Sequence, residues 1–348
     1  MLLKMASVLS TLFVLNLSFP HSAKAEECPD NREALGTSRV MKVSTSQGPV
    51  GLVSYKKTLD LQDKEVVLTF DDGPIPNRTS AVLATLAKEC VKATFFTVGT
   101  MASAYPKLVQ DEAAAGHSIG THTWSHRYLT QRRNRNVAHY QIGGGLHAAN
   151  VALGDQRQAL SPFFRFPGLN HNKRLDAFVA KNGLISVSVD IVADDWLLIT
   201  PKEVLKRTLA RLEQRGRGII LMHDIHNRTV QMLPELLREL KTRGYKVVHI
   251  VPDYQETKVA LNSLDEPENK AYQNAMTRTR TKLAKLAPLD DAPVLEAPRV
   301  VDYIVEQNLM PSKSSPIKGA KLQISGFKRG DISPITIPFS KVVMRGLQ

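Results

Sequence analysis

The stretch Glu65-Val66-Val67-Leu68-Thr69-Phe70-Asp71-Asp72-Gly73-Pro74 decides the fold of this chain. Its apolar residues form a short run that is typical of a strand buried on both faces, and Gly73-Pro74 ends that strand. Two carboxylates therefore stand at the carboxyl end of a buried strand. Adjacent carboxylates near a core repel each other and lose hydration, so a cation, a metal or a catalytic role usually compensates. Taken by itself, Asp-Asp-Gly-Pro could also be a surface turn.

Predicted strands and helices alternate downstream of this stretch. The further strands are expected at 92–98, 117–120, 163–166, 184–189, 218–222 and 245–250, and the helices at 79–90, 106–115, 137–153, 174–181, 201–214 and 229–242. This alternation predicts an α/β protein with a parallel sheet. The seven strands favour a closed or nearly closed barrel, with a doubly wound open sheet as the alternative.

Residues 1–25 have the features of a secretory signal. A lysine stands near the start, an apolar segment runs from Val8 to Leu17, and Ala23-Lys24-Ala25 fits an Ala-x-Ala cleavage site. The apolar segment is too short for a permanent anchor, so we expect cleavage before Glu26 and export to the periplasm or envelope of a bacterium. No later segment is apolar enough to span a bilayer. An uncleaved signal that anchors the chain is the alternative.

The rest of the chain divides into an N-terminal arm (26–59), a central domain (60–253) and a basic C-terminal extension (254–348) of uncertain structure. The extension could be a flexible tail, a small β-structured appendage or a strap across the barrel, and we expect it to be partly disordered. The net charge of the chain is +13. In an exported protein this charge favours contact with an anionic envelope polymer over nucleic acid.

Two cysteines, Cys28 and Cys90, remain after the predicted cleavage. In an oxidising compartment they could pair and tie the arm to the first helix. They could equally stay unpaired, because the sequence does not show whether they lie close together.

Two histidines follow the third predicted strand. His122 and His126 have the i, i+4 spacing that places two imidazoles on one face of a helical turn. Most such pairs bind no metal, but Asp72 could supply a carboxylate as the third ligand, which favours a metal site. Two imidazoles and one carboxylate leave coordination positions open for water and substrate, as in a catalytic metal site.

Arg165 and His223 also stand at strand ends. Arg165 ends an aromatic strand, where its guanidinium needs an anionic partner, and Asp71 is the candidate; a surface arginine is the alternative. His223 could be a general acid if a carboxylate raises its pKa, or else a structural histidine. The candidates for that carboxylate are Asp190, Asp194 and Asp195.

These residues stand in five ordered motifs: Thr69-Phe70-Asp71-Asp72-Gly73, His122-Thr123-Trp124-Ser125-His126, Arg165-Phe166-Pro167-Gly168, Asp195-Trp196 and Leu221-Met222-His223-Asp224. The set resembles the motifs of the polysaccharide deacetylases, also called NodB-homology or carbohydrate esterase family 4 enzymes, over about residues 60 to 250. The resemblance implies a distorted (β/α)7-type barrel. It also implies metal-dependent removal of N-acetyl groups from a glycan such as a chitooligosaccharide, peptidoglycan or an exopolysaccharide.

The resemblance further implies a role for each motif residue. Asp71 would be the general base and His223 the general acid. A divalent metal, usually zinc, would be bound by Asp72, His122 and His126. Arg165 would position Asp71, and Asp195 would tune His223. Trp196 and Leu221 would line the acetyl pocket, and Pro167 and Gly168 would contact substrate.

One departure from the family pattern concerns Gly168, which stands where the third motif often has an aromatic residue. Its N–H can still serve the oxyanion, but one wall of the sugar groove is missing. This keeps open an amide hydrolase for a small non-sugar substrate, although export argues against it. A non-catalytic glycan-binding protein is a further alternative, against which the presence of both Asp71 and His223 argues.

Overall fold

The computed structural model describes residues 28–29, 31–131 and 135–253. The predicted signal at 1–25 and the predicted basic extension at 254–348 lie outside these residues. All the described residues belong to one compact unit. In the described part of the chain, no helix has both the length and the apolar character that a membrane span requires.

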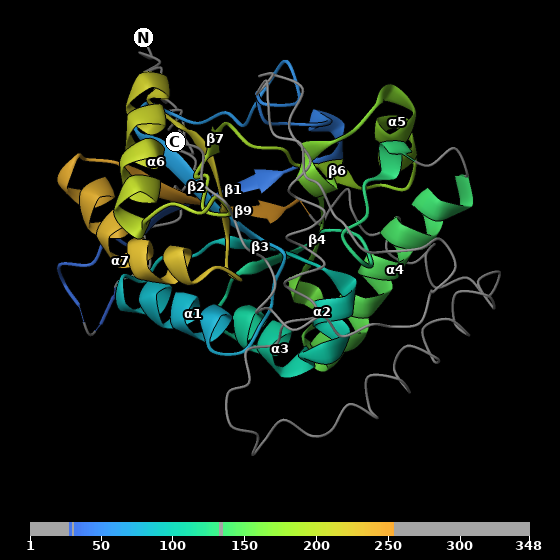
Figure 1. The fold of residues 1–348 in the computed structure, drawn as a ribbon, viewed down its shortest axis with the longest axis horizontal. Helices are drawn as coiled ribbons and strands as arrows, with labels where there is room; N and C mark the ends of the chain where they lie inside the picture. Colours follow the sequence, from blue (N-terminus) through green and yellow to red (C-terminus); the bar gives the residue numbers. More distant parts are fainter. Residues whose placement is uncertain (1–27, 30, 132–134, 254–348) are drawn as a thin grey trace, which may run out of the picture. The chain divides into compact units, whose positions relative to one another are not determined.

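The described strands form one parallel sheet (Figure 1). They are β1 (Thr37–Val43), β2 (Glu65–Asp71), β3 (Thr94–Thr97), β4 (Ser118–Thr121), β5 (Leu160–Phe164), β6 (Ile185–Ser186), β7 (Ile191–Val192), β8 (Gly218–His223) and β9 (Lys246–Pro252). From β2 the pairing runs through β3, β4 and β5 to β6, and from β7 it returns through β8 to β2. The sheet therefore curls round on itself. The predicted α/β class and barrel-type sheet are confirmed, and the open-sheet alternative is wrong.

The identity of the seventh barrel strand differs from the prediction. The expected strand at 184–189 is shortened to β6, which pairs with β5, and the unpredicted short strand β7 follows it and pairs with β8. The expected last strand, β9, instead pairs with β1 and with the first two residues of β2. β1 was not predicted, and it arises from the segment expected to be an arm.

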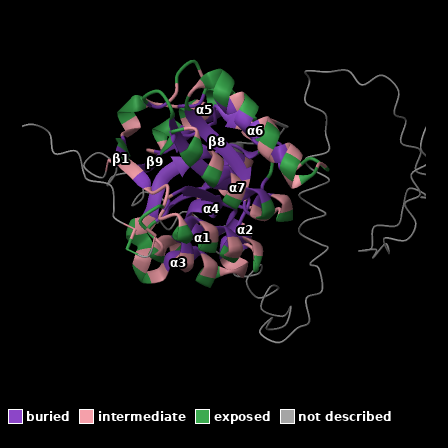
Figure 2. Cartoon of the chain, turned by 90° about the vertical axis from the view of Figure 1, so that its left-hand side faces the viewer, coloured by how far each residue is buried: buried purple, intermediate pink, exposed green. Residues whose placement is uncertain are grey.

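Helices cover the outside of the curled sheet (Figure 1). They are α1 (Arg78–Lys88), α2 (Gly99–Ala104), α3 (Pro106–Ala114), α4 (Arg135–Leu153), α5 (Lys173–Lys181), α6 (Pro201–Arg215) and α7 (Asn227–Thr242). Their ends follow ordinary rules: Thr200 caps α6 by accepting from the N–H of Glu203, and Gly216 ends it in the left-handed region. Figure 2 shows buried residues concentrated in the strands and exposed residues on the outward helix faces.

Side chains on the two faces of β2 pack into two different hydrophobic cores. Val66, Leu68 and Phe70 pack with the helices in one core, whereas Val67 packs in a second core with residues of β1, β8 and β9. Side chains two apart on a strand share a face, so Thr69 and Asp71 point the same way as Val67, into the curl of the sheet. All seven β2 residues are buried, as the sequence predicted.

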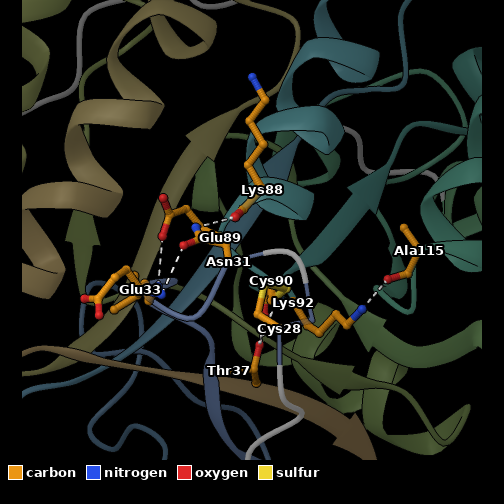
Figure 3. Close-up of a disulfide and its surroundings, with 10 residues drawn as sticks. Cys28, Asn31, Glu33, Thr37, Lys88, Glu89, Cys90, Lys92 and Ala115 are labelled. Atoms are coloured by element: carbon orange, nitrogen blue, oxygen red, sulfur yellow. Dashed lines mark hydrogen bonds between the residues drawn. A yellow bond between two sulfur atoms is a disulfide. The ribbon is translucent and has the colours of Figure 1, made fainter.

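The segment before β2 is fastened to the barrel at several points. Cys28 and Cys90 form a disulfide with a Cα–Cα distance of 5.7 Å, which answers the question that the sequence left open (Figure 3). Beside it, the Leu35 N–H donates to the Glu89 carboxylate over 2.8 Å. Farther along, the N–H of Leu52 and the hydroxyl of Thr58 donate to Asp190.

Candidate active site

The register of the strands brings the motif residues to one rim of the sheet. Asp71 lies opposite His223 where β2 pairs with β8. His122 and Arg165 directly follow residues that are paired between β4 and β5. Because carboxyl ends of parallel strands lie at the same edge, these four side chains gather there from distant parts of the chain.

Asp72 lies between two imidazoles at this rim. Its Oδ1 is 3.3 Å from Nε2 of His126 and 3.6 Å from Nε2 of His122. One candidate ligand atom from each residue lies within 4.8 Å of the others. The Asp72 oxygens are buried and accept no hydrogen bond from the described residues. A buried carboxylate left without donors beside two imidazole nitrogens suits a divalent cation, and the three side chains therefore fit the predicted metal.

The two histidines converge through a turn, and the predicted helical turn is wrong. Residues 122–128 have no helix, and Thr123 and His126 take positive φ values of 68° and 53°. Nδ1 of His122 donates to the carbonyl oxygen of Arg165 over 2.8 Å, which leaves its Nε2 directed at Asp72. Burial lowers the pKa of His122 to about 3, so the imidazole is neutral, the form that binds metals.

Arg165 and Asp71 form the expected ion pair. Arg165 is 1% exposed, and its Nη1 donates to Oδ1 of Asp71 over 2.6 Å and to the hydroxyl of Thr69 over 2.9 Å. Nε donates to the carbonyl of Val187, and the guanidinium lies 3.9 Å from the ring centroid of Phe96. Burial raises the pKa of Asp71 to about 6 although the charge of Arg165 opposes this. Asp71 is thus a fixed, buried carboxylate with a pKa near neutrality.

His223 is held by Asp195, which identifies the carboxylate among the three candidates. The backbone N–H and Nδ1 of His223 each lie 2.7 Å from an oxygen of Asp195. Burial lowers the pKa of His223, but the Asp195 carboxylate outweighs burial and raises it to about 10. Nε2 faces Oδ2 of Asp72 at 4.0 Å. Asp190 instead holds the N-terminal segment, and Asp194 pairs with Arg207 and Arg211.

The residues predicted to contact substrate lie close to motif residues along the chain. Trp196 is half-buried and lies edge-on to His223, with ring centroids 5.5 Å apart. Leu221 is buried on β8. Pro167 and Gly168 belong to the short 3-10 helix η4 (Pro167–Leu169), in which Gly168 has a φ of 59°.

Two aromatic side chains near the cluster were not predicted. The ring of Tyr128 lies 6.3 Å from that of His126, and the ring of His226 lies 5.6 Å from that of His223. Burial lowers the pKa of His226 to about 4. Tyr128 follows His126 by two positions and His226 follows His223 by three. This short distance in sequence was the feature that could have indicated that both residues lie near the site.

Comparison with known proteins shows which family the chain resembles. A profile described as "Polysaccharide deacetylase" matches residues 58–187. The chain is 34% identical over 194 residues to the peptidoglycan-N-acetylglucosamine deacetylase PgdA of Listeria monocytogenes, covering 56% of this chain and 40% of that protein. It is 30% identical over 203 residues to a chitooligosaccharide deacetylase of Bradyrhizobium sp., covering 54% of this chain and 90% of that one.

A solved structure agrees with these relatives. The fold matches the peptidoglycan deacetylase Bd3279 of Bdellovibrio bacteriovorus with a TM-score of 0.57 and 33% identity, over 66% of this chain and 62% of that one. The chain thus spans less than two thirds of both the Listeria relative and this structural neighbour.

Proposed function

The chain belongs to the polysaccharide deacetylase family, and on that premise we propose that it hydrolyses the N-acetyl groups of an amino-sugar glycan and releases acetate. Peptidoglycan and chitooligosaccharides are the substrates named for its relatives, and an exopolysaccharide is the third class that the motifs suggest. The proposal depends mainly on one observation. Asp72, His122 and His126 converge, with Asp71 and His223 beside them.

The metal that suits this site is zinc. Two imidazole nitrogens and a carboxylate are a donor set that zinc accepts with coordination positions left open. Bound there, the ion would polarise the acetyl carbonyl and acidify a water molecule. His122 is oriented for this role by its bond to the Arg165 carbonyl, and Asp72 has no competing donor among the described residues.

The side chains around the site divide the proton transfers between them. Asp71 accepts a proton from the attacking water, whose oxygen bonds to the acetyl carbon. The N–H of Gly168 donates to the oxygen that becomes negative. His223 donates its Nε2 proton to the sugar nitrogen as the C–N bond breaks, because an amide nitrogen leaves only when protonated. The products are acetate and a free amine.

Several side chains hold these groups in the required states. A pKa of about 10 keeps His223 protonated at neutral pH, and Asp195 fixes its orientation. Arg165 fixes Asp71 through a buried bond of 2.6 Å. Trp196 and Leu221 line the acetyl pocket.

The test is acetate release by the purified, zinc-loaded protein from N-acetylglucosamine tetramer, peptidoglycan and an acetylated exopolysaccharide. We expect release from at least one of them, and release from none would overturn the proposal. Asp71→Asn should abolish turnover yet keep the metal, whereas Asp155→Asn, the same change at an exposed site, should change neither. A glycan-binding protein without catalysis would bind the glycans and release no acetate.

Export and the basic extension are further proposals from the sequence. The features of residues 1–25 support secretion to the cell envelope, and the positive charge of 254–348 supports contact with an anionic envelope polymer. Both segments lie outside the described residues. Fractionation of cells that produce the full chain tests the first, and cosedimentation with isolated envelopes at low and high salt tests the second.

A further inference from the structure

The ring of Tyr128 occupies the space in front of Gly168. A Cβ built on Gly168 would lie 2.8 Å from the hydroxyl oxygen of Tyr128 and 2.9 Å from Cζ, and closer still to Cε1. Real Cβ atoms do not approach neighbours so closely, so no side chain fits at position 168 while Tyr128 keeps its place. The tyrosine ring can therefore lie at this place only because residue 168 is a glycine.

The loops that carry these two residues are joined on either side of the contact. The hydroxyl of Thr130 donates to Oδ1 of Asn170 over 2.7 Å. Leu129 is 2% exposed and packs in one hydrophobic cluster with Phe166. Tyr128 itself is only half-buried. These two attachments hold the loops together on the far side of Tyr128 from His126 in the sequence.

Tyr128 lies beside one of the candidate metal ligands. Its ring lies 6.3 Å from that of His126, which in turn lies 3.3 Å from Oδ1 of Asp72. His223 faces the other oxygen, Oδ2, at 4.0 Å. Trp196 lies edge-on to His223. Two partly exposed aromatic residues thus accompany the site, Tyr128 beside His126 and Trp196 beside His223.

We propose that Tyr128 is the aromatic wall of the glycan groove on the metal-ligand side, and that its ring packs against a sugar ring next to the reacting acetamide. The inference depends on the proposed function, which makes the ligand a sugar. The wall that Gly168 cannot provide is supplied from the loop after β4. The face of an aromatic ring is apolar and slightly negative, which suits the C–H bonds on a pyranose face, and the phenol rim tolerates water.

The experiment compares a glycan with a substrate that has no sugar. Acetate release from N-acetylglucosamine tetramer and hydrolysis of 4-nitrophenyl acetate are measured with the zinc-loaded full chain, and the ratio of the two kcat/KM values is taken for each variant. Tyr128→Ala should lower this ratio roughly five- to tenfold, mainly by raising KM for the tetramer, because one aromatic contact is lost. Tyr128→Phe keeps the ring face and should stay within about twofold of the original ratio.

A second variant tests the same wall from the other loop. Gly168→Ala places a methyl group where the ring lies, so it should displace Tyr128 and lower the ratio as Tyr128→Ala does. If Tyr128→Ala does not fold, Gly168→Ala decides by the same criterion. A folded Tyr128→Ala or Gly168→Ala variant whose ratio stays within about twofold overturns the inference while leaving the deacetylase in place. A wild-type protein that cleaves the ester but no glycan would instead overturn the proposed function.

Discussion

The buried pair of Arg165 and Asp71 gives a prediction whose size follows from the structure. Arg165→Leu removes the guanidinium and keeps an apolar side chain in a site that is 1% exposed. The carboxylate of Asp71 then loses its 2.6 Å partner but remains 2% exposed. A charge left buried without its partner usually costs 3–5 kcal/mol, so we expect the free energy of unfolding to fall by about 4 kcal/mol.

A second substitution, at Asp71, should restore part of the stability that Arg165→Leu loses. In the double variant Arg165→Leu/Asp71→Asn no uncompensated charge is buried, so the double variant should be more stable than Arg165→Leu alone by about 2 kcal/mol. Urea unfolding at pH 7 measures both effects, provided that the m value stays constant. The expected fall in melting temperature for Arg165→Leu is roughly 10 °C.

Two results would refute this reasoning. A loss below about 1 kcal/mol for Arg165→Leu would mean that Asp71 takes up a proton, or that water or a rearranged neighbour solvates it in place of the guanidinium. Additive losses in the double variant would mean that the arginine stabilises by packing on Phe96 and by its carbonyl contacts, independently of the charge of Asp71.

Other predictions concern the acid, the core and the disulfide. Asp195→Asn should lower kcat for acetate release by roughly 100-fold and leave the metal content unchanged, because His223 loses the carboxylate that orients it. The control Asp194→Asn should leave kcat within about twofold. Equal effects of the two variants would contradict the pairing of Asp195 with His223. Glu112 is fully buried in α3 with neither oxygen hydrogen-bonded among the described residues, and burial raises its pKa well above the usual value. A carboxyl whose pKa is raised in the folded state stabilises the fold at pH values below its unfolded pKa, and this stabilisation is lost as the pH rises. Glu112→Gln should therefore raise the melting temperature by about 2–4 °C at pH 8 and by less at pH 5. Calorimetry that shows the same change at both pH values would contradict this expectation. Cys28→Ser/Cys90→Ser opens a crosslink between residues 62 apart, so the free energy of unfolding should drop by about 4 kcal/mol, and reductant should reproduce that loss in the wild type but not in the variant.

The elements that the sequence predicted well are those with strong local signals. The apolar run in β2, bounded by Gly73-Pro74, is the clearest case, and its seven buried residues agree with a strand covered on both faces. The helix α6 has Thr200 and Pro201 at its start and Gly216 after its end. At such positions the side chain and the backbone preference agree with the fold.

The elements that were missed depend on contacts between distant segments. β1 has only weak apolar alternation, and it becomes a strand because β9 pairs with it from the other end of the domain. α2 is six residues long and begins with Gly99, so neither length nor capping marks it. Tertiary structure decides both.

The candidate site was predictable in its residue types but not in its geometry. Positive φ angles at Asp72, Thr123 and His126 turn the ligands toward one another, and non-glycine residues give no sign of such angles in a sequence. Because those angles could not be foreseen, the i, i+4 spacing of the two histidines was interpreted as a helical turn. The residues alone left Asp190, Asp194 and Asp195 as candidates for the partner of His223; the family resemblance favoured Asp195, and Asp195 is the one that contacts His223.

The most direct measurement of the central claim is acetate release from N-acetylglucosamine tetramer followed alongside bound metal, in the wild type and in His126→Ala. We expect one zinc ion per wild-type chain, loss of acetate release on chelation and its return when zinc is added back. We expect His126→Ala to lose both the ion and the activity. Acetate release that persists in a metal-free protein, or in a folded His126→Ala variant, would contradict it.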